Sequence, residues 1–394
     1  MPRLTLAVFL CISAPLFVPG LVGCGTTAPA SGTTTVVNPG PGQPSPATGT
    51  NQTIVKIVAN DLAWDPVNQV IYLSLPSADP SIGNAIQIVN PTTGALGQNV
   101  FVGSEPNLVA VSASSKYLYV GLDGESEVKR LALPGLSVDG VMALGNTFAG
   151  SNTAFDIQPA PNADPTVAVI AGVKLFDSQE STGVQIYDGN TPRPQALNEF
   201  YSYDSLQWSS DGTEAFAVNY ENSGFDFFTI PVTASGFGVP TDYPEYLNGT
   251  GNIHFDSSTG MVYEDTGQIF ATSPVSKAGE FAAGGLMVPD GKLNKAFFLG
   301  WSQSSPGNEV YTLTTFDLQR MTLISSMTIQ GNTGVPSRLI RWGSDGLAFT
   351  ARTSDYLNGA LYIVNGGFVA NASDKAATGA RGTGKTTDAK GQTP

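Results

Sequence analysis

Short apolar segments alternate with polar turns through the middle of the chain. The apolar segments are rich in branched and aromatic residues, which favour pleated strands, and no helical periodicity follows the first twenty residues. In seven places an apolar strand, a polar turn and a second strand follow one another, with the turns at 65–68, 112–115, 159–162, 209–212, 256–260, 289–291 and 344–346. The pattern predicts an all-β protein.

The repeated unit has the length of a propeller blade. Successive units begin 35 to 52 residues apart, near residues 61, 107, 154, 205, 251, 286 and 338. This interval is typical of one four-stranded blade. The sequence therefore predicts a single β-propeller of seven four-stranded blades.

The two ends of the repeat region predict how the ring closes. The last repeat stops after its third strand, at 361–364, and a lone apolar strand at 54–58 precedes the first repeat. A blade that lacks a strand leaves an unpaired edge, so we expect the N-terminal strand to complete the last blade. The alternative is an isolated extra strand outside the ring.

Two phrases carry a family resemblance. Residues 115–120 (SKYLYV) and 88–94 (IVNPTTG) resemble the YVTN-type repeats of bacterial surface proteins and the seven-bladed lactonase-like propellers. The resemblance spans nearly all of the repeat region and is best in the first two repeats. It implies a propeller scaffold, and for the lactonase-like members it implies calcium held by carboxylates.

The N-terminus has the features of a secretory leader. Arg3 precedes the apolar run 4–18, and Leu21–Cys24 resembles the bacterial lipobox, in which a Cys after a small residue is lipidated. Cys24 is the lipidation candidate, because the other Cys, Cys11, lies inside the leader. The alternative is an ordinary signal peptide cut after Ala30.

These features divide the chain into four parts. We expect a lipoprotein signal peptide at 1–23, a flexible linker rich in Gly, Thr, Pro and Ser at 24–53, the propeller at 54–370 and a disordered tail at 371–394. The prediction is a lipid-anchored protein of the bacterial cell envelope. By resemblance to enterobacterial lipoproteins, Gly25 in place of Asp favours the outer membrane.

The net charge of the chain disfavours one class of binding partner. The net charge is -14, with 32 acidic and 18 basic residues. Nucleic-acid binding needs clustered Lys and Arg, so we expect no nucleic-acid partner. We expect the protein to contact the membrane through its lipid anchor. Its ligand is expected to be a protein or a small molecule that the sequence does not identify, and the chain is predicted to be a monomer.

Motifs for catalysis are absent from the sequence. It contains no Gly-x-Ser-x-Gly elbow, no His-Glu-x-x-His and no phosphate-binding loop, and a single His, His254. One His excludes a multi-His metal site. We therefore predict no catalytic residues and no metal ligands.

The alignment of the first strands gives candidate channel residues. Side chains alternate along a strand, so equivalent positions share the face that lines the axis of a propeller. This face carries polar groups in several repeats, and the candidate ligand-binding residues are Asp61, Gln207, Asn252, His254 and Arg341. The alternative is a water-filled channel that tolerates polar residues.

Acidic residues follow the second strands of several repeats. The loops contain Asp79, Asp123, Glu125, Glu127, Asp177, Glu180, Glu221, Glu264, Asp265 and Asp355. On a propeller these loops lie on one face, where carboxylates could bind calcium. A solvated acidic rim is the alternative, because the ligands are not spaced as in a known calcium loop.

The resulting functional hypothesis is a non-catalytic binding or scaffold lipoprotein of the cell envelope. The alternatives are a lactonase-like metal-dependent hydrolase and an envelope assembly factor. We expect no cofactor, apart from calcium if the acidic loops converge.

Overall fold

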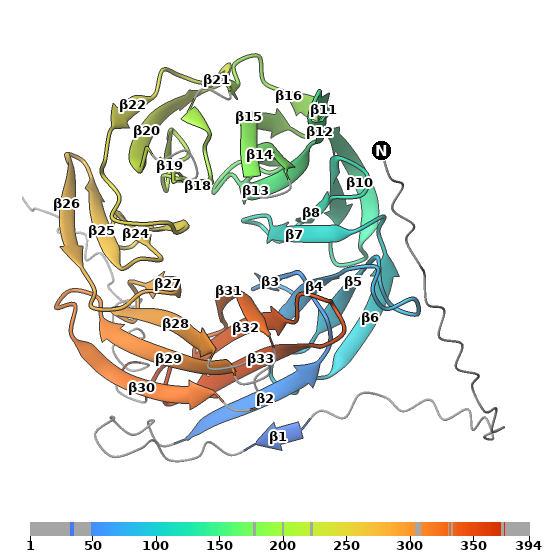
Figure 1. Ribbon diagram of the computed structural model, residues 1–394, viewed down its shortest axis with the longest axis vertical. Coiled ribbons are helices and arrows are strands. Elements are labelled where there is room, and N and C mark those ends of the chain that lie inside the picture. Colours follow the sequence, from blue (N-terminus) through green and yellow to red (C-terminus); the bar gives the residue numbers. More distant parts are fainter. Residues whose placement is uncertain are drawn as a thin grey trace, which may run out of the picture.

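A computed structural model describes residues 32–34, 49–175, 179–198, 201–220, 224–303, 309–329, 331, 334–371 and 374. The elements form seven antiparallel sheets arranged as the blades of a β-propeller (Figure 1). The predicted all-β class and the seven blades are confirmed.

The first three blades follow the meander order expected from the sequence. They are β3 (Asp61–Asp65), β4 (Val70–Leu75), β5 (Ala85–Val89) and β6 (Leu96–Phe101); β7 (Pro106–Val111), β8 (Tyr117–Leu122), β9 (Glu127–Ala132) and β10 (Ser137–Ala143); and β13 (Thr153–Pro159), β14 (Thr166–Lys174), β15 (Gln179–Asp188), β16 (Thr191–Pro192) and β17 (Leu197–Asn198). A small hairpin, β11 (Asn146–Thr147) and β12 (Gly150–Ser151), lies between the second and third blades in sequence.

The next three blades repeat this order. They are β18 (Ser205–Trp208), β19 (Glu214–Asn219), β20 (Asp226–Thr233), β21 (Gly236–Phe237) and β22 (Thr241–Tyr243); β23 (Ile253–Asp256), β24 (Met261–Glu264), β25 (Gln268–Thr272) and β26 (Val275–Glu280); and β27 (Leu286–Asp290), β28 (Lys295–Gln303), β29 (Glu309–Asp317) and β30 (Leu323–Ile329).

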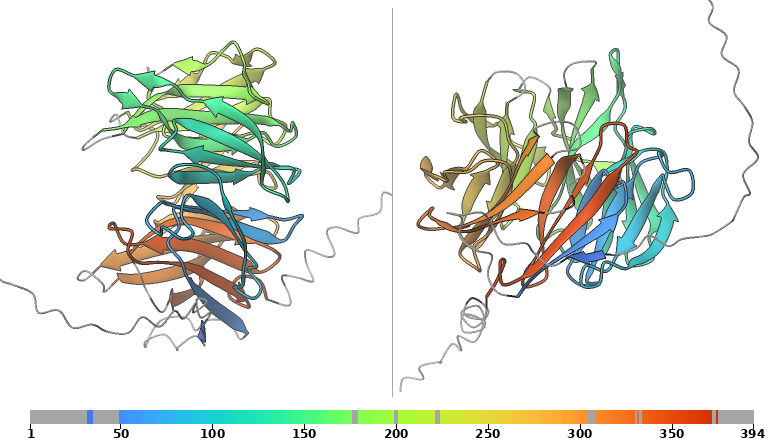
Figure 2. Two further views of the ribbon diagram at one scale, coloured as in Figure 1. Left: turned by 90° about the vertical axis from the view of Figure 1, so that its right-hand side faces the viewer. Right: turned by 60° about the horizontal axis from the view of Figure 1, so that its bottom comes forward.

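The seventh blade combines both ends of the chain. It contains β31 (Val335–Trp342), β32 (Gly346–Arg352), β33 (Gly359–Gly366) and the N-terminal strand β2 (Thr50–Lys56), and β1 (Gly32–Thr34) pairs with the outer side of β2. In Figure 2 the blue strand β2 lies beside the red strands of this blade. The predicted closure of the last blade by the N-terminal strand is confirmed.

The predicted bounds of this strand, 54–58, are wrong at both ends. Strand β2 begins at Thr50 and ends at Lys56, so it pairs along β33 from Gly366 to Ala360. Residues 50–53 are polar, and an apolar pattern does not detect them, because a β-ladder is held by backbone groups whatever the side chains are. Four residues of β2, and β1, thus fall within the range 24–53 that the sequence predicts as a linker.

The hydrophobic core is divided among the blade interfaces. Seven apolar clusters are found, one between each pair of neighbouring blades, and the cluster between the last and first blades includes Val55 and Leu361. Each sheet is therefore covered on both faces. This explains the continuous apolar runs of second strands such as β4 and β8, in which five of six residues are buried.

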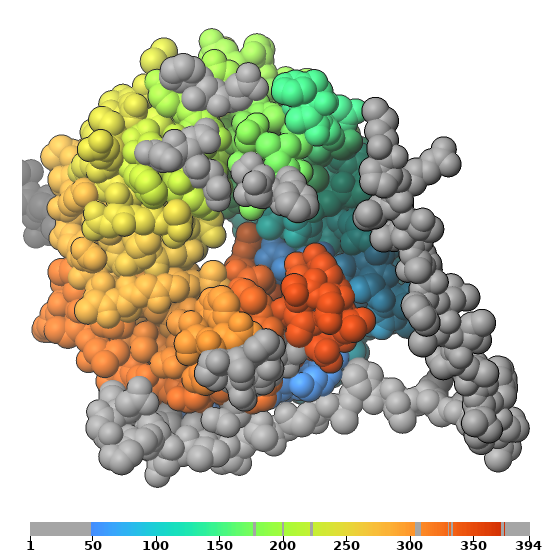
Figure 3. Space-filling model, in the orientation of Figure 1, coloured from blue at the N-terminus to red at the C-terminus, as the bar shows by residue number. Residues whose placement is uncertain are grey.

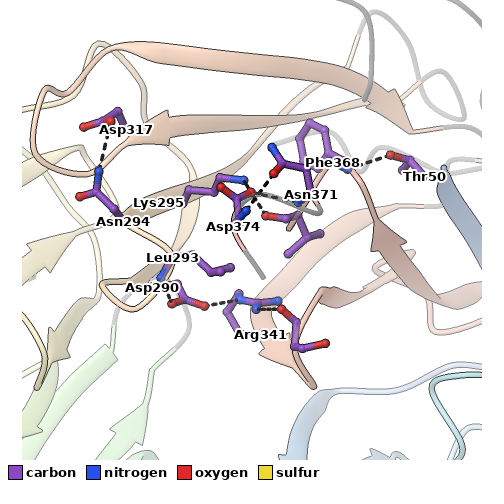
Figure 4. Close-up of polar contacts among 12 residues, drawn as sticks. Thr50, Asp290, Leu293, Asn294, Lys295, Asp317, Arg341, Phe368, Asn371 and Asp374 are labelled. Carbon is purple, nitrogen blue, oxygen red and sulfur yellow. Dashed lines mark hydrogen bonds and ion pairs between the residues drawn. The ribbon is translucent and has the colours of Figure 1, made fainter. Parts of the chain in front are cut away.

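The chain after β33 packs against the interface between blades six and seven. Phe368 and Val369 are buried in the cluster at this interface, and the Phe368 amide donates to Thr50 Oγ1 at 2.9 Å. Lys295, in strand β28 of blade six, also contacts this segment: its Nζ lies 2.9 Å from Val369 O and 2.7 Å from Asp374 Oδ2 (Figure 4). Asp374 lies within the range predicted as a tail, and its ion pair ties that residue to blade six.

Candidate functional site

A central cavity lies where the first strands of the blades meet. Its volume is about 620 Å³, within the usual range for small-molecule sites. Figure 3 shows the hollow at the middle of the ring. Every blade contributes to the wall, which includes Asn60, Asn107, Phe155, Gln158, Ser205, Leu286, Met287, Arg338, Leu339 and Arg352.

All five channel residues predicted from the sequence line this cavity. They are Asp61, Gln207, Asn252, His254 and Arg341. The alternation of side chains along the first strands is the signal that located them. Cys24, the predicted lipidation site, lies outside the described residues.

Asp61 forms an ion pair across the seam where the ring closes. Its buried carboxylate lies 3.2 Å from Arg338 Nε, which comes from the last blade, and accepts a hydrogen bond from the Val109 amide of the second blade at 2.9 Å. Burial raises the pKa of Asp61, and Arg338 opposes this effect. The pair therefore joins three blades at the cavity wall.

Arg341 is held by a different carboxylate. Its Nε lies 2.9 Å from Asp290 Oδ2 (Figure 4). Its other nitrogens donate to the carbonyl oxygens of Ser344 and Gly346. Burial lowers the pKa of Arg341, and Asp290 opposes this effect. Because its donors already have protein partners, Arg341 has less capacity to bind a ligand than Arg338.

Asp156 is a buried acid at the cavity that the sequence reasoning missed. Its carboxylate accepts hydrogen bonds from the Ile157 amide and Gln158 Nε2, both at 2.8 Å, and from the Leu206 amide of the next blade at 2.9 Å. Burial raises the pKa of Asp156, and these hydrogen bonds oppose the effect. Asp156 thus connects the third and fourth blades.

β-Bulges explain why Asp156 and Arg338 were missed. The pairing register shifts between Ala154 and Asp156 in β13, and between Pro336 and Leu339 in β31. A bulge adds one residue and so changes which side chains face the channel. Strict alternation cannot predict this change.

His254 is paired with Asp265, which the sequence reasoning assigned only to the acidic rim. His254 Nε2 lies 2.8 Å from Asp265 Oδ1, and the same oxygen accepts a hydrogen bond from the Met287 amide of the next blade. Asp265 Oδ2 accepts from the Asn252 amide at 3.2 Å. The loop after a second strand thus supplies a cavity residue, which a search of the first strands could not find.

Inter-blade hydrogen bonds recur around the cavity. Asp61, Asp156, Ser205 and Asp265 each accept a backbone amide from the first strand of the next blade. These side chains hold neighbouring blades at fixed spacing. The cavity wall is therefore rigidly built.

The acidic loops do not form a calcium site among the described residues. No group of three or more His, Cys, Asp or Glu side chains in this part of the chain is arranged to hold a metal ion. Asp123 pairs with Lys174, and Glu125 and Glu127 pair with Lys129. Asp177 and Glu221 lie outside the described residues. Calcium binding by these loops stays a prediction.

The described ranges also contain no helix with the length and hydropathy needed to span a bilayer.

Comparisons with known proteins are consistent with the fold. No family model and no curated protein matches the chain. Among solved structures, a chain of Kuenenia stuttgartiensis hydrazine synthase is 13% identical, with a TM-score of 0.55, over 77% of this chain and 95% of that chain. A chain of the mitotic checkpoint complex is also 13% identical, with a TM-score of 0.53, over 91% of this chain and 99% of that chain.

Dihydro-heme d1 dehydrogenase NirN, in complex with DHE, is a third similar structure. It is 13% identical, with a TM-score of 0.50, over 78% of this chain and 64% of that chain. At this identity the similarity shows the propeller fold alone. Proteins with unrelated activities share it, so function has to be argued from the site.

Proposed function

We propose that this chain is a non-catalytic binding protein of the bacterial cell envelope, and that its ligand site is the central cavity. The observation that carries the proposal is the cavity wall, in which all seven blades place side chains around one space of about 620 Å³. Small-molecule sites commonly combine apolar walls with a few fixed polar groups. Here Phe155 and Leu286 supply apolar surface, and Gln207, Asn252 and Arg338 supply polar groups.

The hydrogen bonds of the acidic residues at the cavity favour a binding function over hydrolysis. Asp61, Asp156 and Asp265 are each held by two or more protein donors, which fix these carboxylates in the wall and reduce their capacity to act as a nucleophile or a metal ligand. The His254–Asp265 pair is the one feature that favours the hydrolase alternative, because a carboxylate orients the imidazole as in many general bases. Comparing ligand binding by the wild-type chain and by a Gln207→Leu variant tests the cavity as the site.

We further propose that Cys24 anchors the protein to the outer membrane. The support is the leader, its lipobox-like end at Leu21–Cys24 and the absence of another Cys after it. Strand β1 begins at Gly32, which pairs with Ile54, so the first described residues after Cys24 lie on the outer side of β2 in the last blade.

Replacing Cys24 with Ser is expected to abolish labelling by palmitate and recovery in the membrane fraction. The thiol is the acyl acceptor, and two or more acyl chains hold a protein stably on a bilayer. A Cys11→Ser variant is the matched control and should behave as the wild type. Palmitate labelling that persists in the Cys24→Ser variant would remove the lipoprotein assignment.

A further inference from the structure

Two carboxamide side chains at the cavity have hydrogen-bond acceptors without a partner in the described ranges. Neighbouring carboxylates determine which end of each carboxamide is the acceptor. Gln158 Nε2 donates to Asp156, and Asn107 Nδ2 donates to Asp123 Oδ2 at 3.0 Å. A carboxylate only accepts hydrogen bonds, so the amide nitrogen must face it. The side-chain oxygens of Gln158 and Asn107 are then acceptors with no hydrogen-bond donor among the described residues.

His254 adds a third acceptor. Asp265 Oδ1 accepts the Met287 amide and lies 2.8 Å from His254 Nε2, so this imidazole nitrogen carries the proton. In the neutral form of the imidazole, Nδ1 is therefore an acceptor. In the part of the chain that the structure describes, no donor reaches Nδ1.

Other cavity residues offer open donors. Gln207 Oε1 accepts the Phe255 amide at 3.5 Å, which leaves Gln207 Nε2 as a donor. Arg352 stacks on Tyr356, with its Cζ atom 3.9 Å from the centre of the ring. No carboxylate among the described residues lies within ion-pair distance of Arg352. Asn252 has a carboxamide that offers both a donor and an acceptor, and nothing in the described ranges bonds to it.

A ligand that matches this wall needs both donors and acceptors. A carboxylate offers only acceptors and an ammonium only donors, whereas each hydroxyl offers both. The cavity charges are also partly compensated, because Arg338 is paired with Asp61 and Arg341 with Asp290. Apolar surface from Phe155 and Leu286 suits the C–H faces of a ring.

We propose that the cavity binds an uncharged, hydroxyl-rich ligand, such as a mono- or disaccharide. The inference rests on the proposed function and specifies its ligand class. The probes that test it are glucose, trehalose and N-acetylglucosamine as neutral hydroxylated compounds, with citrate and glutamate as charged compounds, titrated calorimetrically into the purified protein at one pH and salt concentration.

At least one neutral probe is expected to bind the wild-type protein. Gln207→Leu and Asn252→Leu should each weaken this binding about tenfold, since each removes a hydrogen-bonding group from the cavity. Gln98→Leu, on the exposed outer strand β6, is the matched control and should bind as the wild type. Thermal unfolding of each variant verifies that it is folded.

Two results would overturn the inference. If citrate or glutamate binds in a Gln207-dependent way and no neutral probe does, the ligand class is wrong and the cavity is still the binding site. If the neutral probes bind with equal affinity to the wild-type protein and to both cavity variants, or if none of the five probes binds, this ligand class is rejected for the cavity.

Discussion

Deleting Thr50–Lys56 is expected to destabilise the entire ring by at least about 5 kcal/mol, and not merely to fray one edge. The deletion removes a seven-residue ladder on β33, and each backbone hydrogen bond contributes about 1 kcal/mol. It also removes Val55, which is 2% exposed, and burial of such a side chain contributes about 2 kcal/mol. Val55 lies in the cluster that joins the last blade to the first, so the loss opens the ring at its seam.

Denaturant unfolding followed by tryptophan fluorescence and circular dichroism measures this effect. A point variant, Val55→Asp, places a carboxylate in the same cluster and should also lower stability by several kcal/mol. Asn51→Asp, at an exposed position of β2, is the matched control and should leave stability unchanged. A deletion variant as stable as the wild type would show that closure by β2 does not hold the ring together.

Glu264→Gln is expected to stabilise the protein at alkaline pH relative to the wild type. Glu264 is fully buried, Thr266 Oγ1 donates to its Oε2 at 2.8 Å, and its Oε1 has no hydrogen-bond partner among the described residues. Burial raises the pKa of Glu264 to about 7, with a smaller contribution from the adjacent Asp265. The folded protein therefore binds this proton more tightly than the unfolded chain, whose pKa is near 4.5.

The sign of the pH effect follows from this difference. The contribution of Glu264 to stability is fully present below pH 4.5 and is lost as the pH rises to about 7, a loss of roughly 3 kcal/mol. The stability of Glu264→Gln minus that of the wild type should therefore rise by about 3 kcal/mol between pH 4 and pH 8, measured by urea unfolding. Glu245→Gln, at an exposed position, is the control. A pH-independent difference would show that Glu264 ionises normally in the folded protein.

The blades could be predicted from the sequence because each repeats the same order of apolar strands and polar turns. Polar turns such as 65–68 separate strands that are buried on both faces, and such strands appear as continuous apolar runs. The closing strand could be predicted because an edge without a partner is unfavourable. Its first residues could not, because Thr50 and Asn51 are polar and their pairing with β33 leaves no apolar pattern in the sequence.

The cavity wall could be predicted only where the strands are regular. Gln207 and His254 lie on strands without a bulge, so alternation places them correctly. Asp156 and Arg338 lie at register shifts, and Asp265 comes from a loop. The partners of Asp61 and His254 are therefore set by tertiary contacts that local pattern does not encode.

Thermal unfolding in the presence of a library of small polar metabolites tests the cavity as a ligand site most directly. The wild-type protein, Gln207→Leu and the exposed control Gln98→Leu are measured side by side, since a ligand that binds the folded state raises its unfolding temperature. We expect compounds that stabilise the wild type and the control equally, and that stabilise Gln207→Leu less. Compounds that stabilise all three proteins equally, or a library without any stabilising compound, would contradict this expectation.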